Sequence, residues 1–404
     1  MKRHLSFLNL FFGVMILSTV GNVCAEFALF YYAFTKFGVS NAVESDLSSV
    51  GLFFIGSAVG RSIIAPILAV FFDKFSSRVS SFAIDISYIF VLIGILSFYS
   101  YSELTLLGIF IATTLTASLS QLHHSSVGFS AIKQNVQKGK GEVILATVFA
   151  IQNSAGLLVA GVISEYFGLK GCIYFALVTF IPILFLYPRI FPMMKDKVKA
   201  KEDFVLSFKK GFDFLIKDKL LLFFGLSVLI FNFVGALIPA FVKYASIETF
   251  GTNNTVVGFI LAGGLLLGTV FYRFFKKFAQ KQSANHILPI SFLPNIIALL
   301  IAYIFPNIYA IGFLYLTACF GSGLRNVVIM GLRKERIPKE LTARVNTLYS
   351  ALINVGQIMG GLFIIPVAQS NLRLGIQYAF VVVCLSGFFA FFFIPKVKVS
   401  EAIK

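Results

Sequence analysis

The sequence has few charged side chains: Asp, Glu, Lys and Arg make up only 13% of its 404 residues, against roughly 25% in soluble proteins. Hydrophobic residues make up 58%, and the mean hydropathy is +0.90. This balance excludes a water-soluble globular protein and predicts an integral membrane protein. The long continuous apolar runs exclude a membrane β-barrel, because barrel strands alternate in polarity over about ten residues.

Cysteines and catalytic motifs are also scarce. The four cysteines, all widely spaced in apolar segments, offer neither a disulfide framework nor a metal cluster. No GxxxxGK[ST] stretch points to ATP hydrolysis, and no HExxH motif or pair of intramembrane carboxylates points to a membrane-embedded hydrolase. We therefore expect a protein that is not an enzyme and that uses no cofactor and no metal.

Acidic residues are half as frequent as basic ones, 17 against 34, which gives a net charge of +17. The basic residues gather in alternate connections between apolar runs: near residues 2–3, 74–78, 133–140, 195–219, 273–281, 333–344 and 396–404. This alternation is the positive-inside pattern of membrane proteins, so it predicts both termini in the cytoplasm and argues against a nucleic-acid partner. The first apolar run continues from Leu5 to about Phe34, too long for a signal-peptide core, and is expected to be a retained span.

Twelve apolar runs can each supply a span of roughly 20 residues: 7–34, 48–72, 79–100, 103–132, 143–167, 171–190, 219–246, 254–275, 286–305, 307–332, 343–369 and 374–395. A lysine-rich connector separates the sixth from the seventh. Its amphipathic piece, Phe204–Ile216, is expected to lie along the inner membrane surface. The sequence thus predicts an N-terminal bundle of residues 1–190, a cytoplasmic linker of 191–218 and a C-terminal bundle of 219–404.

The two halves look duplicated. The stretch Ala65–Arg78 recurs as Gly264–Lys277 at an offset of 199 residues (264 minus 65), and shorter matches link other spans of the two halves. Two parallel repeats about an axis along the membrane normal predict an all-α fold. Its twelve transmembrane helices would form two pseudo-symmetric six-helix bundles.

Asp73, Lys74 and Arg78, preceded by Ala65-Pro66 and Ala69, form the segment with the clearest family resemblance. It resembles the loop motif between the second and third helices of the major facilitator superfamily. Together with Ser207–Asp218 and Ile337–Gly361, it is similar to the bacterial drug:proton antiporters that include macrolide-efflux and enterobactin-export proteins. The resemblance implies a gating role for Asp73, Lys74 and Arg78 and a multi-pass location in a bacterial inner membrane.

Glu26 and Arg61 are charged residues inside predicted spans. A charge near the bilayer centre costs at least ~2.5–3.5 kcal/mol, so each needs a partner or a function. Arg61 precedes Asp73 by twelve residues, about 18 Å along a helix, which places it near mid-membrane. We predict that Glu26 carries the coupling proton and that the approach of Arg61 favours its charged form. The alternative is a purely structural ion pair.

Further polar residues lie in spans that the resemblance places around a central cavity. Arg61, His124, Arg325, Gln121, Asn153 and Asn232 are predicted to bind substrate, and His124 aligns with Arg325 between the repeats. The alternative for each is a structural hydrogen bond between helices. His123 points to a different helix face from His124 and is expected to be packed, while Asp85 is expected to pair structurally near the inner face.

These predictions favour a proton-coupled secondary active transporter that moves a small organic molecule by alternating access. Two arginines and a histidine pair favour an anionic substrate. The first choice is efflux of a drug-like or anionic siderophore-like compound by a monomer in the lipid bilayer. Two alternatives stay open: import of a small organic anion or siderophore, and a membrane sensor or scaffold that does not transport.

Overall fold

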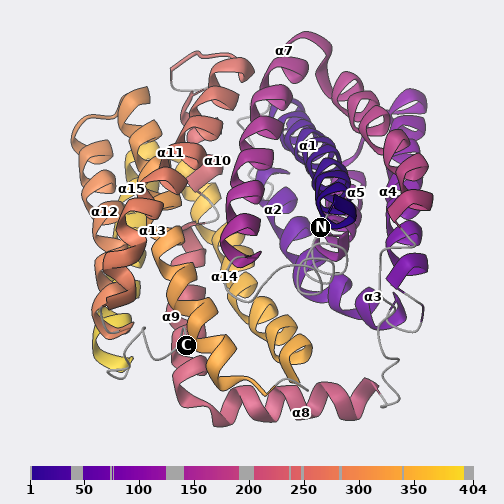
Figure 1. The fold of residues 1–404 in the computed structure, drawn as a ribbon. Coiled ribbons are helices and arrows are strands. Elements are labelled where there is room, and N and C mark those ends of the chain that lie inside the picture. Colours follow the sequence, from indigo (N-terminus) through magenta and orange to yellow (C-terminus); the bar gives the residue numbers. More distant parts are fainter. Residues whose placement is uncertain are drawn as a thin grey trace. The chain divides into compact units, whose positions relative to one another are not determined.

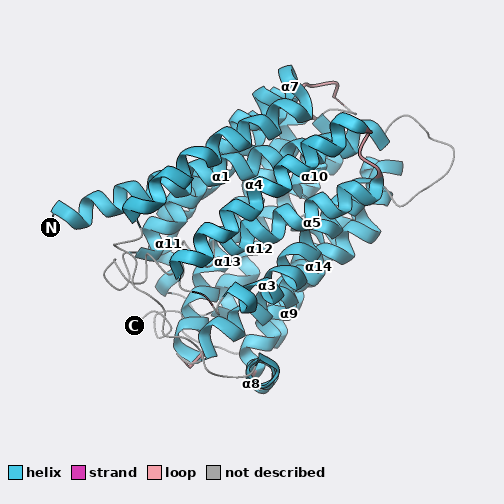
Figure 2. Ribbon diagram, turned by 90° about the vertical axis from the view of Figure 1, so that its right-hand side faces the viewer, coloured by secondary structure: helices cyan, strands magenta, loops and turns pink. Residues whose placement is uncertain are grey.

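The structure is a computed structural model. It describes residues 2–37, 49–72, 75, 77–123, 141–190, 204–235, 238–246, 250–281, 284–338 and 341–394. Throughout these residues the chain forms helices joined by turns, and no strand occurs among them (Figure 2). The predicted all-α fold is confirmed.

The first six predicted spans all contain helices, and residues 124–132 of the fourth lie outside the described residues. The helices are α1 (Lys2–Phe37), α2 (Ser49–Val59) continued by η1 (Gly60–Ile64) and α3 (Ala65–Phe72), α4 (Ser77–Tyr101), α5 (Leu106–Leu122) and α7 (Gly141–Ile190). Helix α7 holds both the fifth and the sixth predicted span. Its helical geometry is broken at Gly168, whose φ of 60° and ψ of −157° suit a residue without a Cβ atom.

The second half follows the predicted order as well. It comprises α8 (Phe204–Lys217), α9 (Lys219–Gly235), α10 (Ile238–Tyr244), α11 (Asn254–Lys281), α12 (Ala284–Ile304), α13 (Ile308–Arg336), α14 (Thr342–Ser370) and α15 (Leu372–Phe393). Within the described part of the chain, eight helices are long and apolar enough to cross a membrane, and three shorter apolar helices accompany them. A multi-pass membrane protein is therefore supported.

The chain divides into two compact units, the first made of residues 1–201 and 254–262 and the second of residues 202–253 and 263–404. In the first unit α1 packs along α7, and α4 contacts both α5 and α7 (Figure 1). In the second unit α9 packs on α14 and α15, and α12 packs on α13 and α15. The proposed bundle boundaries at residues 190 and 219 stay a prediction.

Small residues allow close helix packing in both units. In the first unit, a Cβ atom added to Gly60 would lie only 2.3 Å from the carbonyl oxygen of Thr114 on α5. In the second, a Cβ atom on Gly268 of α11 would lie 2.6 Å from Cys319 on α13. Such small-residue contacts let membrane helices approach each other closely. In each half, a glycine therefore lets the second predicted span pack closely on the fourth, which supports the predicted duplication.

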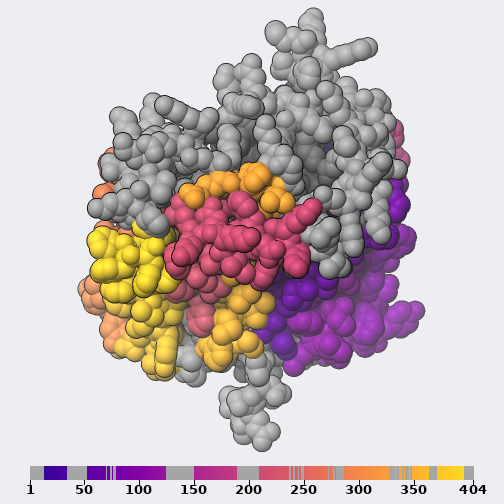
Figure 3. Space-filling view, turned by 90° about the horizontal axis from the view of Figure 1, so that it is seen from below, coloured from indigo at the N-terminus to yellow at the C-terminus, as the bar shows by residue number. Residues whose placement is uncertain are grey.

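Helix α8 matches the predicted amphipathic segment. It contacts α9 and α14 within the second unit, and it is the rose-coloured segment seen from below in Figure 3. Asp218 follows α8 and accepts a hydrogen bond from the backbone N–H of Leu221 at 3.1 Å, so it caps the start of α9. Its other oxygen lies 2.7 Å from Nε of Arg336. This ion pair joins the end of α13 to the junction of α8 and α9.

Candidate functional site

Glu26 and Arg61 form an ion pair within the first unit. The Nη2 atom of Arg61 lies 3.2 Å from Oε1 and 3.0 Å from Oε2 of Glu26, so one nitrogen bridges both carboxylate oxygens. The side chains are 34% exposed for Arg61 and 23% exposed for Glu26. The predicted pairing of these two residues is thus observed, whereas the proton-carrying role of Glu26 stays a prediction.

The backbone around Arg61 explains how the pair is positioned. Arg61 lies on η1, a single turn of π-helix in which the N–H of Ala65 bonds to the carbonyl of Gly60. Single π-helical turns within α-helices frequently occur at functional sites. Since Gly60 has no side chain, this turn packs directly against the α5 backbone at Thr114. The close contact fixes the turn from which Arg61 reaches toward α1.

Tyr88 of α4 lies within electrostatic range of both members of this pair. Its ring stacks on Phe180 with the ring centroids 4.8 Å apart, and the whole side chain is buried. Its hydroxyl has no hydrogen-bond partner among the described residues. A buried hydroxyl without a partner carries a desolvation cost, so Tyr88 is a candidate member of the site.

Arg325 of α13 is 2% exposed within the second unit. Its Nη1 atom lies 3.2 Å from the carbonyl oxygen and 3.4 Å from Oγ of Ser291, and its Nη2 atom lies 3.4 Å from Oγ of Ser322. The guanidinium carbon lies 3.7 Å from the ring centroid of Phe231 and 4.7 Å from that of Phe292. Two aromatic faces and three oxygens therefore hold the cation.

The charge of Arg325 has no carboxylate within ion-pair distance in the described part of the chain. Close by, a Cβ atom on Gly321 would lie 3.1 Å from Nη1 of Arg325 and 3.2 Å from Oδ1 of Asn295. The amide of Asn295 is 0% exposed, and neither its oxygen nor its nitrogen has a hydrogen-bond partner among the described residues. A buried cation beside an unsatisfied amide can accept an anion.

For the remaining predicted site residues, the structure gives burial and hydrogen bonds that do not distinguish a binding role from a structural one. Gln121 on α5 and Asn153 on α7 are both half-buried, and Nδ2 of Asn232 donates to the carbonyl oxygen of Ile353 on α14 at 3.0 Å. Their substrate-binding roles stay predictions. Arg78 belongs to α4, while His124, Asp73 and Lys74 lie outside the described residues.

The structure brings together a second polar cluster that the sequence did not reveal. Nδ1 of His123 lies 2.7 Å from Oδ1 of Asp85, and Nε2 of His123 lies 2.9 Å from Oγ of Ser18. The hydroxyl of Tyr187 donates to Oδ2 of Asp85. All four side chains are at most 2% exposed. The sequence suggested only that Asp85 pairs and that His123 is packed, because the two residues lie 38 positions apart.

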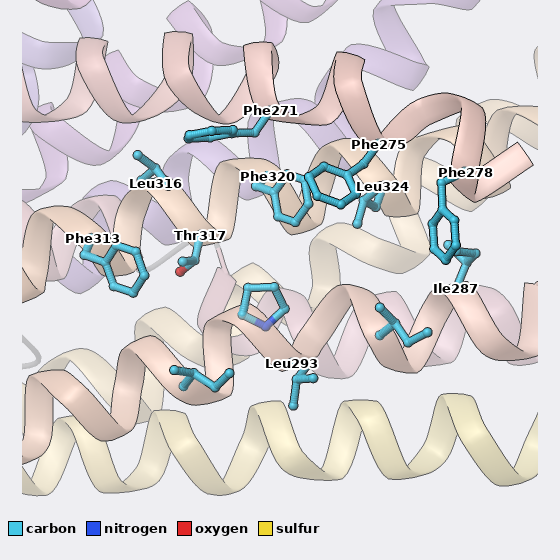
Figure 4. A pocket seen from close by; sticks show the side chains of 13 residues that line it. Phe271, Phe275, Phe278, Ile287, Leu293, Phe313, Leu316, Thr317, Phe320 and Leu324 are labelled. Carbon is cyan, nitrogen blue, oxygen red and sulfur yellow. The ribbon is translucent and has the colours of Figure 1, made fainter.

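A separate apolar cavity of about 420 Å³ lies among α11, α12 and α13 in the second unit (Figure 4). Phe271, Phe275 and Phe278 of α11 line it together with Phe320 of α13, whose ring meets that of Phe275 edge to face, and Thr317 is its single polar lining residue. Leu324 lines the cavity, whereas the neighbouring Arg325 turns toward Phe231 and Phe292. This cavity suits hydrocarbon and is not a site for a charged substrate.

Comparison with known proteins agrees with this architecture. The profile of the Major Facilitator Superfamily matches residues 6–361. The nucleoside transporter NupG has a similar structure, with a TM-score of 0.67 at 13% identity over 95% of this chain and 98% of that one. No curated protein sequence matches the chain.

Two further solved structures are similar at this level. The human organic anion transporter MFSD10 (TETRAN) has a TM-score of 0.61 at 12% identity, over 95% of this chain and 98% of that one. A bacterial homologue of the iron transporter ferroportin, in an inward-facing state, has a TM-score of 0.63 at 14% identity, over 97% and 99%.

The match to a transporter family over most of the chain, together with the membrane-length apolar helices, indicates a membrane transporter rather than an enzyme. The chain belongs to the Major Facilitator Superfamily, whose profile covers most of its length. The predicted superfamily is thereby confirmed. Membership in the drug:proton antiporter group stays a prediction.

Proposed function

We propose that this transporter is a proton-coupled secondary carrier of a small organic anion, with Glu26 as the group that takes up the proton. The observation that carries the proposal is the single-nitrogen bridge from Arg61 to both oxygens of Glu26. A carboxylate held by one partly exposed arginine can be protonated without unfolding the helices around it. The pair can therefore change charge during a transport cycle.

Protonation of Glu26 changes what Arg61 can bind. While Glu26 is charged, it neutralises Arg61 and repels an anionic substrate. Once Glu26 is protonated, Arg61 keeps an uncompensated positive charge in a partly buried place, which favours a substrate carboxylate or other anion. The proton and the anion therefore bind together, and by linkage each increases the affinity for the other.

Coupled binding of this kind supports movement of the anion in the same direction as the proton. Under an inward proton gradient this is import, the alternative that the sequence analysis left open. Efflux is the second candidate, favoured by the similarity of residues 65–78 to drug:proton antiporters. Efflux by proton exchange requires that the bound cargo weaken proton binding at Glu26, as a cationic group on a drug-like cargo would do.

Arg325, which lies in the second unit, also favours an anionic cargo. Its buried charge lacks a carboxylate partner among the described residues, and the neighbouring Asn295 amide offers a further donor. The proteins of similar structure carry nucleosides, organic anions and iron, so the fold leaves the cargo open. Two arginines, Arg61 and Arg325, against the single carboxylate of Glu26 are what favour an anion.

The test has two stages. Metabolite profiling of cells and medium, with and without the gene, identifies the cargo and its direction. Flux of that cargo is then measured in proteoliposomes with an imposed pH gradient and again after a protonophore collapses it. Gradient-driven accumulation that disappears with the protonophore supports proton coupling. An unchanged rate overturns it.

The choice between import and efflux needs a matched pair of variants. Glu26→Gln imitates the protonated carboxyl, and Arg373→Gln removes an exposed arginine of α15 as a control. If an anion is cotransported, Glu26→Gln binds it at all pH values but no longer accumulates it. If a cation is exported, Glu26→Gln loses binding altogether.

A further inference from the structure

The cluster around His123 joins four helices of the first unit. Asp85 comes from α4, His123 follows α5, Tyr187 comes from α7 and Ser18 from α1, and each side chain is at most 2% exposed. An ionisable group inside a membrane span is costly unless it is paired or functional. Here an acid and a histidine share one contact of 2.7 Å.

The donors and acceptors of the cluster allow two arrangements of protons, and the first has a proton on Nε2 of His123. Oγ of Ser18 lies 3.1 Å from the carbonyl oxygen of Met15, to which its hydroxyl donates. With this hydrogen in use, Ser18 accepts from Nε2–H of His123. A proton must then also lie between Nδ1 of His123 and Asp85, either on the ring or on the carboxyl. In this state the Asp85–His123 pair carries no net charge.

A second arrangement fits the same heavy atoms with one proton fewer. If Nε2 of His123 loses its proton, it becomes an acceptor, and the Ser18 hydroxyl can rotate from Met15 to donate to it. Nδ1–H then donates to a charged Asp85, which the Tyr187 hydroxyl also stabilises. The pair now carries a charge of −1. Rotation of one hydroxyl therefore accommodates both protonation states.

We propose that Asp85 and His123 form a second proton-binding site of this transporter, with Ser18 as the residue that adjusts to its protonation. Among the described residues, Ser18 from α1 and the titratable Tyr187 from α7 form hydrogen bonds with the pair. For its role in transport the proposal rests on the proton coupling proposed above. Binding of the proton itself does not depend on transport.

Tyr88 links this site to the ion pair of Glu26 and Arg61. It lies three residues after Asp85 on α4, so both side chains share one face of the helix. Its hydroxyl is free of partners among the described residues, and it lies within electrostatic range of Glu26 and Arg61. The first unit therefore holds two ionisable pairs, and Tyr88 shares a helix face with a member of one and lies near the other, which supports a cycle that moves two protons.

The direct test is nitrogen NMR of the full-length protein in nanodiscs, labelled with ¹⁵N-histidine. The chain has four histidines, and His123→Gln assigns the signals of His123 by their loss. We expect the His123 signals to differ between pH 5 and pH 9, with Nε2 protonated in the first arrangement and unprotonated in the second. In Asp85→Asn the midpoint should fall by about one pH unit or more, because the carboxylate that stabilises the imidazolium is gone.

Ser18→Ala is the second variant, since it keeps both ionisable groups and removes only the hydroxyl. It should also shift the midpoint, whereas His286→Gln, at an exposed position on α12, should not. His123 nitrogens that are identical at pH 5 and pH 9, or a midpoint unaffected by Asp85→Asn, overturn the proposal. These measurements need no cargo, so they fail or succeed independently of proton-coupled transport.

The consequence for transport is measured in proteoliposomes as protons moved per cargo molecule. The ratio should fall from two to one in His123→Gln and in Asp85→Asn, and stay at two in His286→Gln. A ratio unchanged by both variants excludes the pair from the cycle. If cargo flux through the unmodified protein does not depend on the pH gradient, the coupling proposed for Glu26 is overturned instead.

Discussion

Nδ1 of His123 lies 2.7 Å from Oδ1 of Asp85, and this contact joins α4 to the end of α5 inside the first unit. The side chains are 2% and 1% exposed, so neither partner can turn to water if the other is lost. The contact therefore affects stability as well as chemistry. Removal of one member leaves the other buried without its partner.

Because of the contact between Asp85 and His123, we predict that the stability losses from substituting the two residues do not add up. Asp85→Leu alone should destabilise the protein by about 3–5 kcal/mol, the cost of breaking a buried pair. The double variant Asp85→Leu/His123→Leu should recover part of that loss, since Tyr187 keeps the carbonyl of Ser81 and Ser18 keeps that of Met15. Unfolding of the purified protein in detergent measures both. Strictly additive losses would show that the two groups are not coupled.

The ion pair of Glu26 and Arg61 predicts opposite effects of its two neutral variants. Glu26→Gln should keep exchange of cargo across the membrane while losing accumulation driven by a pH gradient. Arg61→Gln should weaken cargo binding about ten- to hundred-fold, the range for a lost charge-assisted hydrogen bond. Its stability cost should stay below that of a fully buried pair, because 34% of Arg61 is exposed. Equal phenotypes for the two variants would contradict separate roles.

Arg325 is predicted to be costly for stability and necessary for function. Arg325→Met removes a buried charge that has no carboxylate partner among the described residues, and keeps an apolar side chain between Phe231 and Phe292. We expect unfolding to become harder by about 1–4 kcal/mol, while cargo binding is lost. Thermal unfolding and binding are measured on the same preparation. A variant that is less stable and still binds cargo would make Arg325 a structural residue.

A substitution at Gly60 tests whether the close contact between the π-helical turn and α5 matters for stability and transport. In Gly60→Ala the new Cβ atom would lie 2.3 Å from the carbonyl oxygen of Thr114, so α5 and the turn that carries Arg61 must separate. We expect a loss of about 1–3 kcal/mol from overpacking and slower flux. Gly94→Ala on α4 is the control, because its Cβ atom would meet no atom within 4 Å. The same melting temperature for both variants would show that the close approach is unimportant.

The helices were the easiest part to predict. A span in lipid must satisfy its backbone hydrogen bonds internally, so a run of about 20 apolar residues dictates a helix. The predicted amphipathic segment, Phe204–Ile216, differs from α8 by one residue. The break between the fifth and sixth predicted spans, 143–167 and 171–190, falls at Gly168, whose backbone is not helical.

Contacts of the site could be predicted only where neighbouring spans hold few charged residues. Glu26 and Arg61 could be paired in advance because few charged residues lie within neighbouring spans. Arg325 was expected to meet substrate, but its place between Phe231 and Phe292 depends on how α9 and α12 pack around α13. Asp85 and His123 were recognised singly and not as a pair, since no spacing rule relates residues on different helices.

The sequence by itself determined that this protein lies in the membrane, which stretches of the chain form its helices, and which side chains are too costly there to be incidental. Those properties follow from hydropathy and charge along the chain, which act residue by residue. Only the tertiary structure decided which of those side chains meet. Helix rotation and close packing at residues such as Gly60 set contacts to within an ångström, and these depend on the whole unit at once.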